Sequence, residues 1–336
     1  MATVTKTIGT SARDYSTVTL WEADLDDSGI YSSGDDAVGE LYNDSVFDEV
    51  VTINGGGTVG LNSRKLTSPV AERHDGTAGI GARIERVVTN AFVMTLSIAP
   101  TTIEFIEILA KRNGNYTAHA ISRADTGSLT VANNILHYDD YGVSRIGDPT
   151  GISQGVASGT HYIMNNLVYD FSDSIGGRGI YLHYGTHEPY NNTVYRCYNG
   201  FDEGSGSTSV VKNNIAVSSD NADFQGFESG DGDYNCDSDS TAMGANSITS
   251  SAANLFTSTV VGSEDLHLKA GADAIDAGTD LGTTPDGVQY DIDGRDRDVQ
   301  GDVWDMGADE LVAAVVADTP ITALFHRFNK RPIYQR

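Results

Sequence analysis

The sequence predicts an all-β chain that winds as a solenoid of stacked turns, and three features support this. The 336 residues are rich in Gly (37) and Tyr (16) and poor in Met (5) and Pro (7), and only 39% are hydrophobic. This composition is typical of many short strands and turns, and it argues against helix bundles and coiled coils. The other two features are an amphipathic segment near the N-terminus and an asparagine pair that recurs along the middle of the chain.

Residues 1–45 are expected to form an N-terminal cap. Within them, Val18, Trp21 and Leu25 follow one another at helical spacing behind Ser16 and Thr17, residue types that favour a helix N-cap. We expect this helix to lie across the open end of the solenoid and to cover strand edges that would otherwise promote aggregation. After the cap, residues 50–55 predict an early strand and corner, and residues 66–84 predict further early turns.

Four asparagine pairs recur in order: Asn133-Asn134, Asn165-Asn166, Asn191-Asn192 and Asn213-Asn214. Their second asparagines are 32, 26 and 22 positions apart, Asn235 follows after another 21, and an expected strand at 103–109 lies upstream. A short strand buries one face only when another strand stacks on it, so each interval is interpreted as one turn. The alternative is a set of chance Asn-rich turns in an antiparallel sandwich, but hairpin signals then recur every 8 to 12 residues.

Asparagine is suited to the corner of such a turn. It tolerates the left-handed backbone conformation better than most residues, which lets the chain leave one sheet for the next. Side-chain amides stacked on one another also form hydrogen-bonded ladders. The pairs therefore predict a shared bend with a ladder of asparagines inside it.

Sequence stretches near both ends of the chain also resemble those of a known protein family. The C-terminal part contains three Asp-rich stretches, at 265–278, 291–298 and 305–310, and the N-terminal part contains Ile8–Ser16, Trp21-Glu22 and Tyr42–Ser45. With the asparagine pairs, these stretches resemble right-handed parallel β-helix proteins encoded near tail genes of tailed bacteriophages and prophages, with the closing coils shared by bacterial and phage members. The resemblance implies a single-stranded right-handed parallel β-helix over residues 46–310, with a short N-terminal capping helix.

The resemblance also implies a function. It suggests a structural protein of a tailed-phage virion, assembled in the host cytoplasm, that serves as an exposed appendage such as a tail fibre or tailspike in contact with host-surface glycans, or as a decoration protein of the head. One alternative is a virion-associated polysaccharide depolymerase, either a glycoside hydrolase or a lyase. Another is a bacterial surface adhesin. Because one fold serves all of these roles, the enzyme question stays open, with a non-enzymatic role preferred.

Residues 311–336 are expected to be a C-terminal extension. Residues 318–336 carry a net charge of +3, whereas residues 1–317 carry −29. Apolar anchors beside basic residues suit docking to another virion protein or to a second copy of the chain, and by analogy we expect a homo-oligomer such as a trimer. The alternatives are a frayed terminus and a strap along the chain's own acidic flank. The expected docking residues are Leu324, Phe325, Arg327, Phe328, Lys330, Arg331, Tyr334 and Arg336.

The overall charge excludes several partners. With 47 acidic and 21 basic side chains the net charge is −26, so nucleic acid and anionic membranes are poor partners. No stretch approaches the roughly 18 apolar residues of a membrane span. The N-terminus has neither a basic start nor an apolar block, so we expect no secretion signal. Cys197 and Cys236 form no CxxC motif and are expected to be free thiols.

The candidate catalytic residues are carboxylates, because glycoside hydrolysis uses two carboxyl groups ~5 to 9.5 Å apart. Glu188 with Glu203 is the first candidate pair, and Asp140 is a further candidate. Six positions after each second asparagine stand Asp140, Ser172, Tyr198 and Asp220. Three turns separate Asp140 from Asp220, roughly 14 Å, which is too far for such a pair.

Tyr138, Tyr184 and His187 are the candidates for glycan contact, since aromatic rings stack on sugars. The alternative interpretation is that these residues pack in the core or lie on the solvated surface and contact no glycan. No GxSxG esterase motif is present, and Gly204–Ser207 is interpreted as a turn.

No cofactor is expected, with structural calcium as the one option. Asp291, Asp293, Asp296 and Asp298 alternate along a loop, as carboxylates do in sites for hard cations. The distal Glu of an EF-hand loop is missing. The alternative, which the family resemblance favours, is a closing loop in which Arg295 and Arg297 pair with the neighbouring acids.

Overall fold

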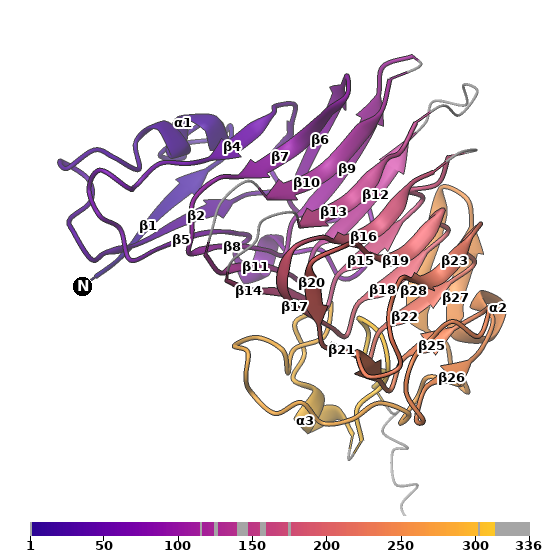
Figure 1. The fold of residues 1–336 in the computed structure, drawn as a ribbon. Helices are drawn as coiled ribbons and strands as arrows, with labels where there is room; N and C mark the ends of the chain where they lie inside the picture. Colours follow the sequence, from indigo (N-terminus) through magenta and orange to yellow (C-terminus); the bar gives the residue numbers. More distant parts are fainter. Residues whose placement is uncertain are drawn as a thin grey trace, which may run out of the picture.

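The chain folds into three parallel sheets that wrap around one elongated interior. This computed structural model describes residues 2–114, 116–123, 127–139, 147–154, 159–173, 176–301 and 303–312. From β2 to β20 successive strands alternate in order among the three sheets, and strands of neighbouring turns pair in parallel. Figure 1 shows the strands stacked from the N-terminal end to the C-terminal end. The predicted all-β parallel β-helix is therefore confirmed.

The three sheets are composed as follows. The first sheet contains β1 (Thr3–Ile8), β2 (Asp36–Leu41), β5 (Ser63–Thr67), β8 (Thr101–Glu104), β11 (Leu129–Ala132), β14 (Thr160–Met164), β17 (Gly185–Tyr190), β20 (Ser207–Ser209), β21 (Val211–Lys212) and β24 (Gly232–Asp233). The second contains β3 (Val46–Phe47), β6 (Arg83–Val88), β9 (Glu107–Arg112), β12 (Ile135–Asp139), β15 (Leu167–Tyr169), β18 (Thr193–Tyr195), β22 (Ile215–Val217), β25 (Cys236–Asp237) and β26 (Ile248–Thr249). The third contains β4 (Val51–Ile53), β7 (Ala91–Leu96), β10 (Ala118–Arg123), β13 (Thr150–Gln154), β16 (Arg178–Leu182), β19 (Asn199–Glu203) and β23 (Ala222–Gln225).

The interior is a continuous apolar core that runs along the stack. Side chains alternate between the two faces of each strand, so every second residue points inward. Ile103, Val131 and Ile163 are register partners on β8, β11 and β14, and none exposes any surface. Equivalent apolar residues lie directly on one another from turn to turn. Each turn therefore shields the core of its neighbours, as expected for a repeat that is not stable alone.

The asparagine pairs form the corner between the first and second sheets. The first asparagine of each pair is left-handed, with φ of 54° to 56° at Asn133, Asn165, Asn191 and Asn213. The second points inward and forms a ladder, in which Asn134 donates to Asn166 (3.1 Å), Asn166 to Asn192 (2.9 Å), Asn192 to Asn214 (2.9 Å) and Asn214 to Asn235 (3.1 Å). The predicted shared bend and its ladder are confirmed.

The expected strand at 103–109 was wrong in one respect, because the same corner divides it. β8 ends at Glu104 and β9 begins at Glu107, and Phe105 takes the left-handed position with φ of 56°. Its ring lies 3.6 Å from the guanidinium of Arg73. The corner thus continues upstream of the asparagine pairs with a different residue type.

The predicted N-terminal helix is α1 (Val18–Ala23), at the N-terminal end of the stack (Figure 1). Thr17 is its N-cap and accepts a hydrogen bond from the Leu20 amide at 3.1 Å. Val18, Trp21 and Leu25 are fully buried, as their spacing predicted. The helix lies beside β4, where the Glu22 carboxylate accepts the amides of Asn54 and Gly55. It therefore satisfies backbone donors at the open end of the third sheet.

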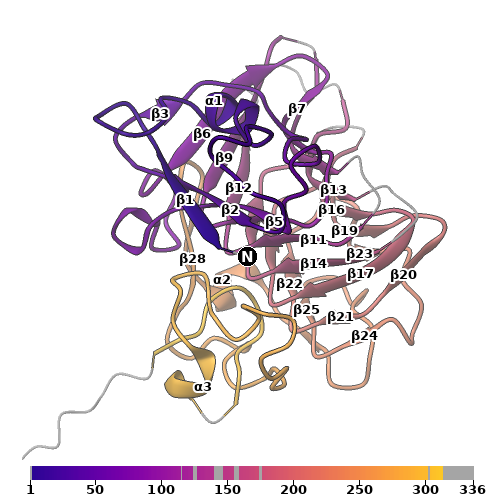
Figure 2. The ribbon, with the colours of Figure 1, turned by 90° about the vertical axis from the view of Figure 1, so that its left-hand side faces the viewer.

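The stacked strands begin at β1 and end at β26, so they start before residue 46 and end before residue 310, the bounds expected from the sequence. After β26 come α2 (Ala252–Leu255) and an antiparallel hairpin of β27 (Phe256–Val260) and β28 (Ser263–Leu268). Residues 270–312, which include α3 (Arg297–Gln300), then return along the flank of the stack. Figure 2, which looks onto the N-terminal end, shows this segment at one side of the sheets. We call residues 270–312 the fold-back.

The fold-back is attached to the asparagine corner. The outward side chains of the first asparagines donate to its backbone carbonyls: Asn165 to Gly287 (3.1 Å), Asn191 to Val288 (3.0 Å), Asn213 to Thr279 (2.8 Å), and Asn133 to Asp291. The Asp-rich stretches were expected to be closing coils stacked on the end. They instead lie in the hairpin and in the fold-back, whose carbonyls accept one asparagine carboxamide per turn.

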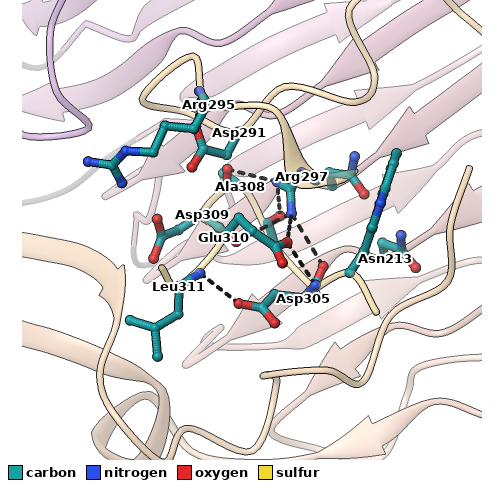
Figure 3. Close-up of polar contacts among 12 residues, drawn as sticks. Asn213, Asp291, Arg295, Arg297, Asp305, Ala308, Asp309, Glu310 and Leu311 are labelled. Atoms are coloured by element: carbon teal, nitrogen blue, oxygen red, sulfur yellow. Dashed lines mark hydrogen bonds and ion pairs between the residues drawn. The ribbon is translucent and has the colours of Figure 1, made fainter. Parts of the chain in front are cut away.

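The fold-back has a charged centre of its own, shown in Figure 3. Arg297 is fully buried and bonds the Glu310 carboxylate at 3.0 Å and the carbonyls of Gly307 and Ala308 at 2.9 Å each. Asp305 accepts the amides of Asp276 (2.7 Å) and Leu311 (2.8 Å). Burial raises the pKa of Glu310 and Asp291 to about 7 and that of Asp305 to about 6. Buried charges therefore hold this segment together internally, whereas neutral asparagine amides attach it to the corner.

No helix in the part of the chain that the structure describes is long and apolar enough to span a membrane.

Candidate functional site

The β27–β28 hairpin stands beside the stack (Figure 1). A cleft of about 820 Å³ is lined by residues of both. Its floor is the corner between the second and third sheets, just after β12, β15, β18 and β22. Its wall is the hairpin turn, residues 261–265, together with Thr77 and Ala78. The remaining lining residues are Leu109, His137, Tyr138, Asp139, Tyr169, Asp170, Ser172, Arg196, Ser218 and Asp220. We call it the Arg196 cleft.

Arg196 joins the two sides of the cleft. Its guanidinium bonds the Asp170 carboxylate of the stack, with Nε to Oδ1 at 2.6 Å, and the Glu264 carboxylate of the hairpin. Both carboxylates contact the same NH2 nitrogen, so their oxygens lie close together. Burial opposes the positive charge of Arg196, but the two carboxylates outweigh it and raise its pKa. Arg196 thus fixes the hairpin on the stack and sets the width of the cleft.

Asp170 differs electrostatically from an ordinary surface carboxylate. Burial raises its pKa, and the opposing charge of Arg196 only partly offsets this. The local backbone explains its position, because Asp170, Arg196 and Ser218 all take the left-handed conformation at the second corner. Each follows its strand directly, so equivalent residues of successive turns gather in one place.

A second polar group lies in the floor. His137 Nε2 is 2.8 Å from Oε1 of Glu107, which is fully buried and also accepts the Gly79 amide at 2.6 Å. Burial acts to raise the pKa of Glu107, but the hydrogen bond and charge of His137 dominate and lower it. The His137 ring stacks on Tyr169 with centroids 5.0 Å apart. These contacts hold the floor of the cleft rigid.

Two more carboxylates of the lining have partners. Asp220 accepts the hydroxyl of Ser172, and Asp265 lies 2.6 Å from Nδ1 of His267. Burial disfavours charge on His267, but the carboxylates of Asp293, Asp309 and Asp265 prevail and raise its pKa to about 10. Asp265 therefore faces a protonated imidazole, whereas Ser172 brings no charge to Asp220.

The candidate glycan contacts fall in three different environments. Tyr138 lines the Arg196 cleft, 6% exposed, and packs on Phe171. Tyr184 is 43% exposed, and its ring lies 3.8 Å from that of His183, away from this cleft. The prediction for His187 was wrong, because this residue is fully buried and points inward from β17. Burial lowers its pKa to about 4, and Nε2 contacts the Tyr184 carbonyl at 2.8 Å.

The candidate catalytic pair is not assembled into one site. Glu203, at the end of β19, accepts the hydroxyl of Ser209 at 2.6 Å, and Ser209 is the buried register partner of the inward-pointing His187. Glu188 is the next residue of β17, so alternation directs it to the outer face, beside Tyr190. The two carboxylates therefore face opposite sides of the first sheet. Asp140 lies outside the described residues.

The four candidate metal ligands have separate roles. Asp291 accepts the Arg295 amide at 2.7 Å, Asp296 caps α3, and Asp298 accepts the Trp304 indole at 2.8 Å. Only Asp293 belongs to a group compact enough for a metal among the described residues, with His267 and Asp309. Its ligand atoms lie within 4.8 Å of one another. Calcium stays a prediction, and a melting temperature that calcium does not change would reject it.

A smaller cleft of about 410 Å³ is lined by residues of the first sheet and of the fold-back. Tyr162 and Tyr290 line it, with the Lys65–Glu104 ion pair at 2.8 Å. The expected docking residues 324–336 and their charges lie outside the described residues.

The sequence carried a signal for the Arg196 cleft that counting by six positions missed. Four positions after each second asparagine stand Tyr138, Asp170, Arg196 and Ser218, and all four line the cleft. Counting by six places Ser172 and Asp220 there as well. No sequence signal indicated Glu264, because the hairpin reaches the stack only through the fold.

Together, the strand order and the cleft define a parallel β-helix with a charged cleft between its stack and its C-terminal hairpin. No protein-family model matches the chain, and no curated protein sequence does either. One similar solved structure is a pectin methylesterase from Aspergillus niger, with 11% sequence identity and a TM-score of 0.31. The match covers 80% of this chain and 92% of that chain.

Proposed function

We propose that the protein is a structural β-helix that holds a host-surface glycan in the Arg196 cleft, as an exposed part of a tailed-phage particle. The observation that supports binding is the lining of the cleft. Thr77, Ser172, Ser218 and Ser263, which carry hydroxyls, line it together with several carboxylates and two tyrosines. A sugar presents many hydroxyl groups in a small space, and such a lining offers donors and acceptors to match them.

The arrangement favours binding over chemistry. Asp170 and Glu264 are held by Arg196, Asp265 by His267 and Asp220 by Ser172, so these carboxylates are already oriented before a ligand arrives. Preorganised groups lose little conformational entropy when a ligand binds, which favours affinity. A rigid stack that presents such a cleft suits an attachment protein.

The virion part of the proposal is supported by the sequence resemblance at the two ends of the chain. Its test is the protein content of purified particles: mass spectrometry should find the chain in intact virions, and immunogold labelling should place it on their surface. Absence from purified particles would reject the virion role and leave glycan binding to be judged separately.

Glycan binding is tested by titrating the full chain with defined oligosaccharides in a calorimeter, beside the variant Arg196→Met. We expect the variant to lose affinity at least about tenfold, because the hairpin wall is no longer fixed. Equal affinity of both proteins would exclude this cleft as the binding site. Circular dichroism of the variant checks that the stack stays folded.

A depolymerase is the second candidate, and one observation favours it. Asp170 and Glu264 share one guanidinium nitrogen inside a cleft, and burial raises the pKa of Asp170. Glycoside hydrolysis uses two neighbouring carboxyl groups, one of which has a raised pKa and acts as the acid. Loss of viscosity of host capsule on incubation with the protein, abolished by Asp170→Asn, would establish it. Unchanged viscosity would reject it.

A further inference from the structure

A histidine in the floor of the Arg196 cleft has a geometry that the proposed binding role does not use. His137 lies on β12, lines the cleft and keeps 17% of its side chain exposed. Its Nε2 is 2.8 Å from Oε1 of Glu107, a side chain with no exposed surface. In the part of the chain that the structure describes, Nδ1 has no hydrogen-bond partner. One ring nitrogen is therefore held by the protein, and the other is left for a ligand.

The Glu107 carboxylate decides which nitrogen of the neutral His137 ring carries the proton. An ionised carboxylate accepts hydrogen bonds and donates none, so Nε2 is the nitrogen that bears hydrogen. Glu107 is held in this ionised form, because the hydrogen bond and charge of His137 lower its pKa against the effect of burial. The lone pair of the neutral ring is then on Nδ1. Such a lone pair takes a proton from water or a hydroxyl group, which is the task of a general base.

Further contacts fix the orientation of this pair. The Glu107 carboxylate also accepts the Gly79 amide, at 2.6 Å to Oε2, and Oε1 lies 3.8 Å from the guanidinium of Arg83. The His137 ring stacks on Tyr169, its register partner on β15, with centroids 5.0 Å apart and an angle of 26° between the planes. A base that is already oriented loses little freedom when it acts. Glu107 is thus a positioning residue, and His137 is the group available to a ligand.

We propose that His137 is the general base of an esterase activity in the Arg196 cleft, which removes acyl groups such as acetyl from the hydroxyls of a bound glycan. This inference rests on the proposed glycan binding and adds an activity to it. Ester hydrolysis suits a single base, because the same nitrogen takes a proton and later returns it. Glycoside hydrolysis uses two separate carboxyl groups instead.

The reaction balances with water as the only other reactant. Nδ1 of His137 takes a proton from a water molecule while the water oxygen bonds to the acyl carbon. The bond from that carbon to the glycan oxygen then breaks, and the leaving oxygen receives the proton from Nδ1. The products are the free carboxylic acid and the glycan hydroxyl, and the imidazole is neutral again. No serine nucleophile takes part, so the step does not depend on a GxSxG motif.

The test measures acetate release by the full chain from two probes, p-nitrophenyl acetate and O-acetylated xylan oligosaccharides. His137→Gln should lower the rate at least about 100-fold, because it removes the base. His183→Gln is the matched control, since that ring lies beside Tyr184 and outside the lining of the cleft, and it should keep the parent rate.

The positioning role of Glu107 has its own test in Glu107→Gln. The glutamine amide can donate to Nε2, which favours the ring form whose lone pair is turned away from the ligand. We expect kcat to fall at least about tenfold with KM unchanged, because the base is then in the wrong form. NMR of the imidazole nitrogens should show the proton on Nε2 in the parent chain and on Nδ1 in a large share of the variant.

The outcomes separate the esterase from glycan binding. Release of acetate from neither probe, equal rates for the parent chain and His137→Gln, or a neutral parent ring that is protonated on Nδ1 would overturn the esterase and leave binding to the calorimetric test. Loss of binding to every oligosaccharide, with His137-dependent hydrolysis of p-nitrophenyl acetate, would overturn the glycan as the substrate. Matching melting temperatures of the variants and the parent chain show that the comparison concerns folded protein.

Discussion

The asparagine corner and the fold-back lie against each other, yet they are stabilised by opposite means. The corner uses neutral amides, each bonded to the next turn at 2.9 to 3.1 Å, and the same solution recurs in every pair. The fold-back is stabilised by one buried arginine, Arg297, among carboxylates, and this arrangement occurs once instead of in every turn. Contacts between neutral amides do not change with pH. The stability of the centre around Arg297, in contrast, depends on the protonation of its carboxyl groups. The Arg196 cleft lies where the stack meets the hairpin that leads into the fold-back.

The largest effect is expected from Arg297→Met. Removing the buried guanidinium takes one donor from each of the Gly307 and Ala308 carbonyls and the counter-charge from the Glu310 carboxylate, which keeps the Asp305 amide. We expect this to cost about 3–5 kcal/mol of the stability of the fold-back. Arg295→Met is the matched control, since that side chain is 47% exposed, and it should cost less than about 1 kcal/mol. Hydrogen exchange measures the loss by region. Similar costs for the two variants would contradict a charged centre at Arg297.

The next effect is expected at the corner, from Asn192→Ala. Asn192 is fully buried and donates to Ile163, Tyr190 and Asn214, so its removal leaves several buried groups unsatisfied, at about 2–4 kcal/mol. Asn191→Ala instead removes an outward bond and places alanine at a left-handed position, at about 1–2 kcal/mol. Urea denaturation compares the two. A larger loss for Asn191→Ala would reverse the assigned roles of the pair.

A change of pH should alter the stability of the two ends of the molecule in opposite directions. The raised pKa values of Asp291, Asp305 and Glu310 mean that the folded state holds protons that the unfolded chain releases, so their contribution is present at low pH and is lost as pH rises through about 6 to 7. The contribution of His267 is complete below its unfolded pKa and is lost as pH rises through about 10. Between pH 5 and pH 8 the fold-back should lose on the order of 1–3 kcal/mol, because groups that share Arg297 titrate together.

The N-terminal end should respond in the opposite sense. The amides of Thr10 and Ser11 hold the pKa of Asp44 below its ordinary value against the effect of burial, and hydrogen bonds do the same for Asp35 and Asp36. Their contribution is present above the unfolded pKa and is lost as pH falls through the lowered values. Hydrogen exchange at pH 4 and pH 8 gives both ends in one experiment. Parallel responses of the two ends would contradict this comparison.

The smallest effect tests the cap. Thr17→Ala should destabilise the N-terminal end by about 1 kcal/mol, because the Leu20 amide loses its acceptor. Ser16→Ala is the control, since the sequence alone offered both residues as caps and the structure uses Thr17. A lower melting temperature for Ser16→Ala than for Thr17→Ala would show that the cap is assigned to the wrong residue.

The sequence predicted those parts of the fold that depend on local or repeated physics. The left-handed preference of asparagine and the stacking of its amide are properties of single residues, so Asn133 to Asn235 marked the corner correctly. Val18, Trp21 and Leu25 marked the helix by spacing alone. The direction of the Asp-rich C-terminal stretches was not predictable in this way, because it depends on carbonyls that meet asparagine side chains up to 158 positions away in the sequence.

The candidate site was predicted only in part for the same reason. Tyr138 lines the Arg196 cleft, four positions after Asn134, and its contact with a glycan stays a prediction. His187 was misplaced, since the alternation of β17 turns it inward, and the same alternation separates Glu188 from Glu203. Arg196 was visible by counting four positions from Asn192. Its partner Glu264 belongs to a hairpin whose position depends on the whole C-terminal segment.

The central functional claim is that a glycan occupies the space between stack and hairpin. The most direct measurement is hydrogen exchange of the full chain with and without the oligosaccharide that binds it most tightly in calorimetry, analysed by mass spectrometry. The account predicts added protection at residues 168–173, 194–198, 216–221 and 259–266 together. Protection confined to the surface around Tyr184, or to the smaller cleft around Tyr162 and Tyr290, would contradict it.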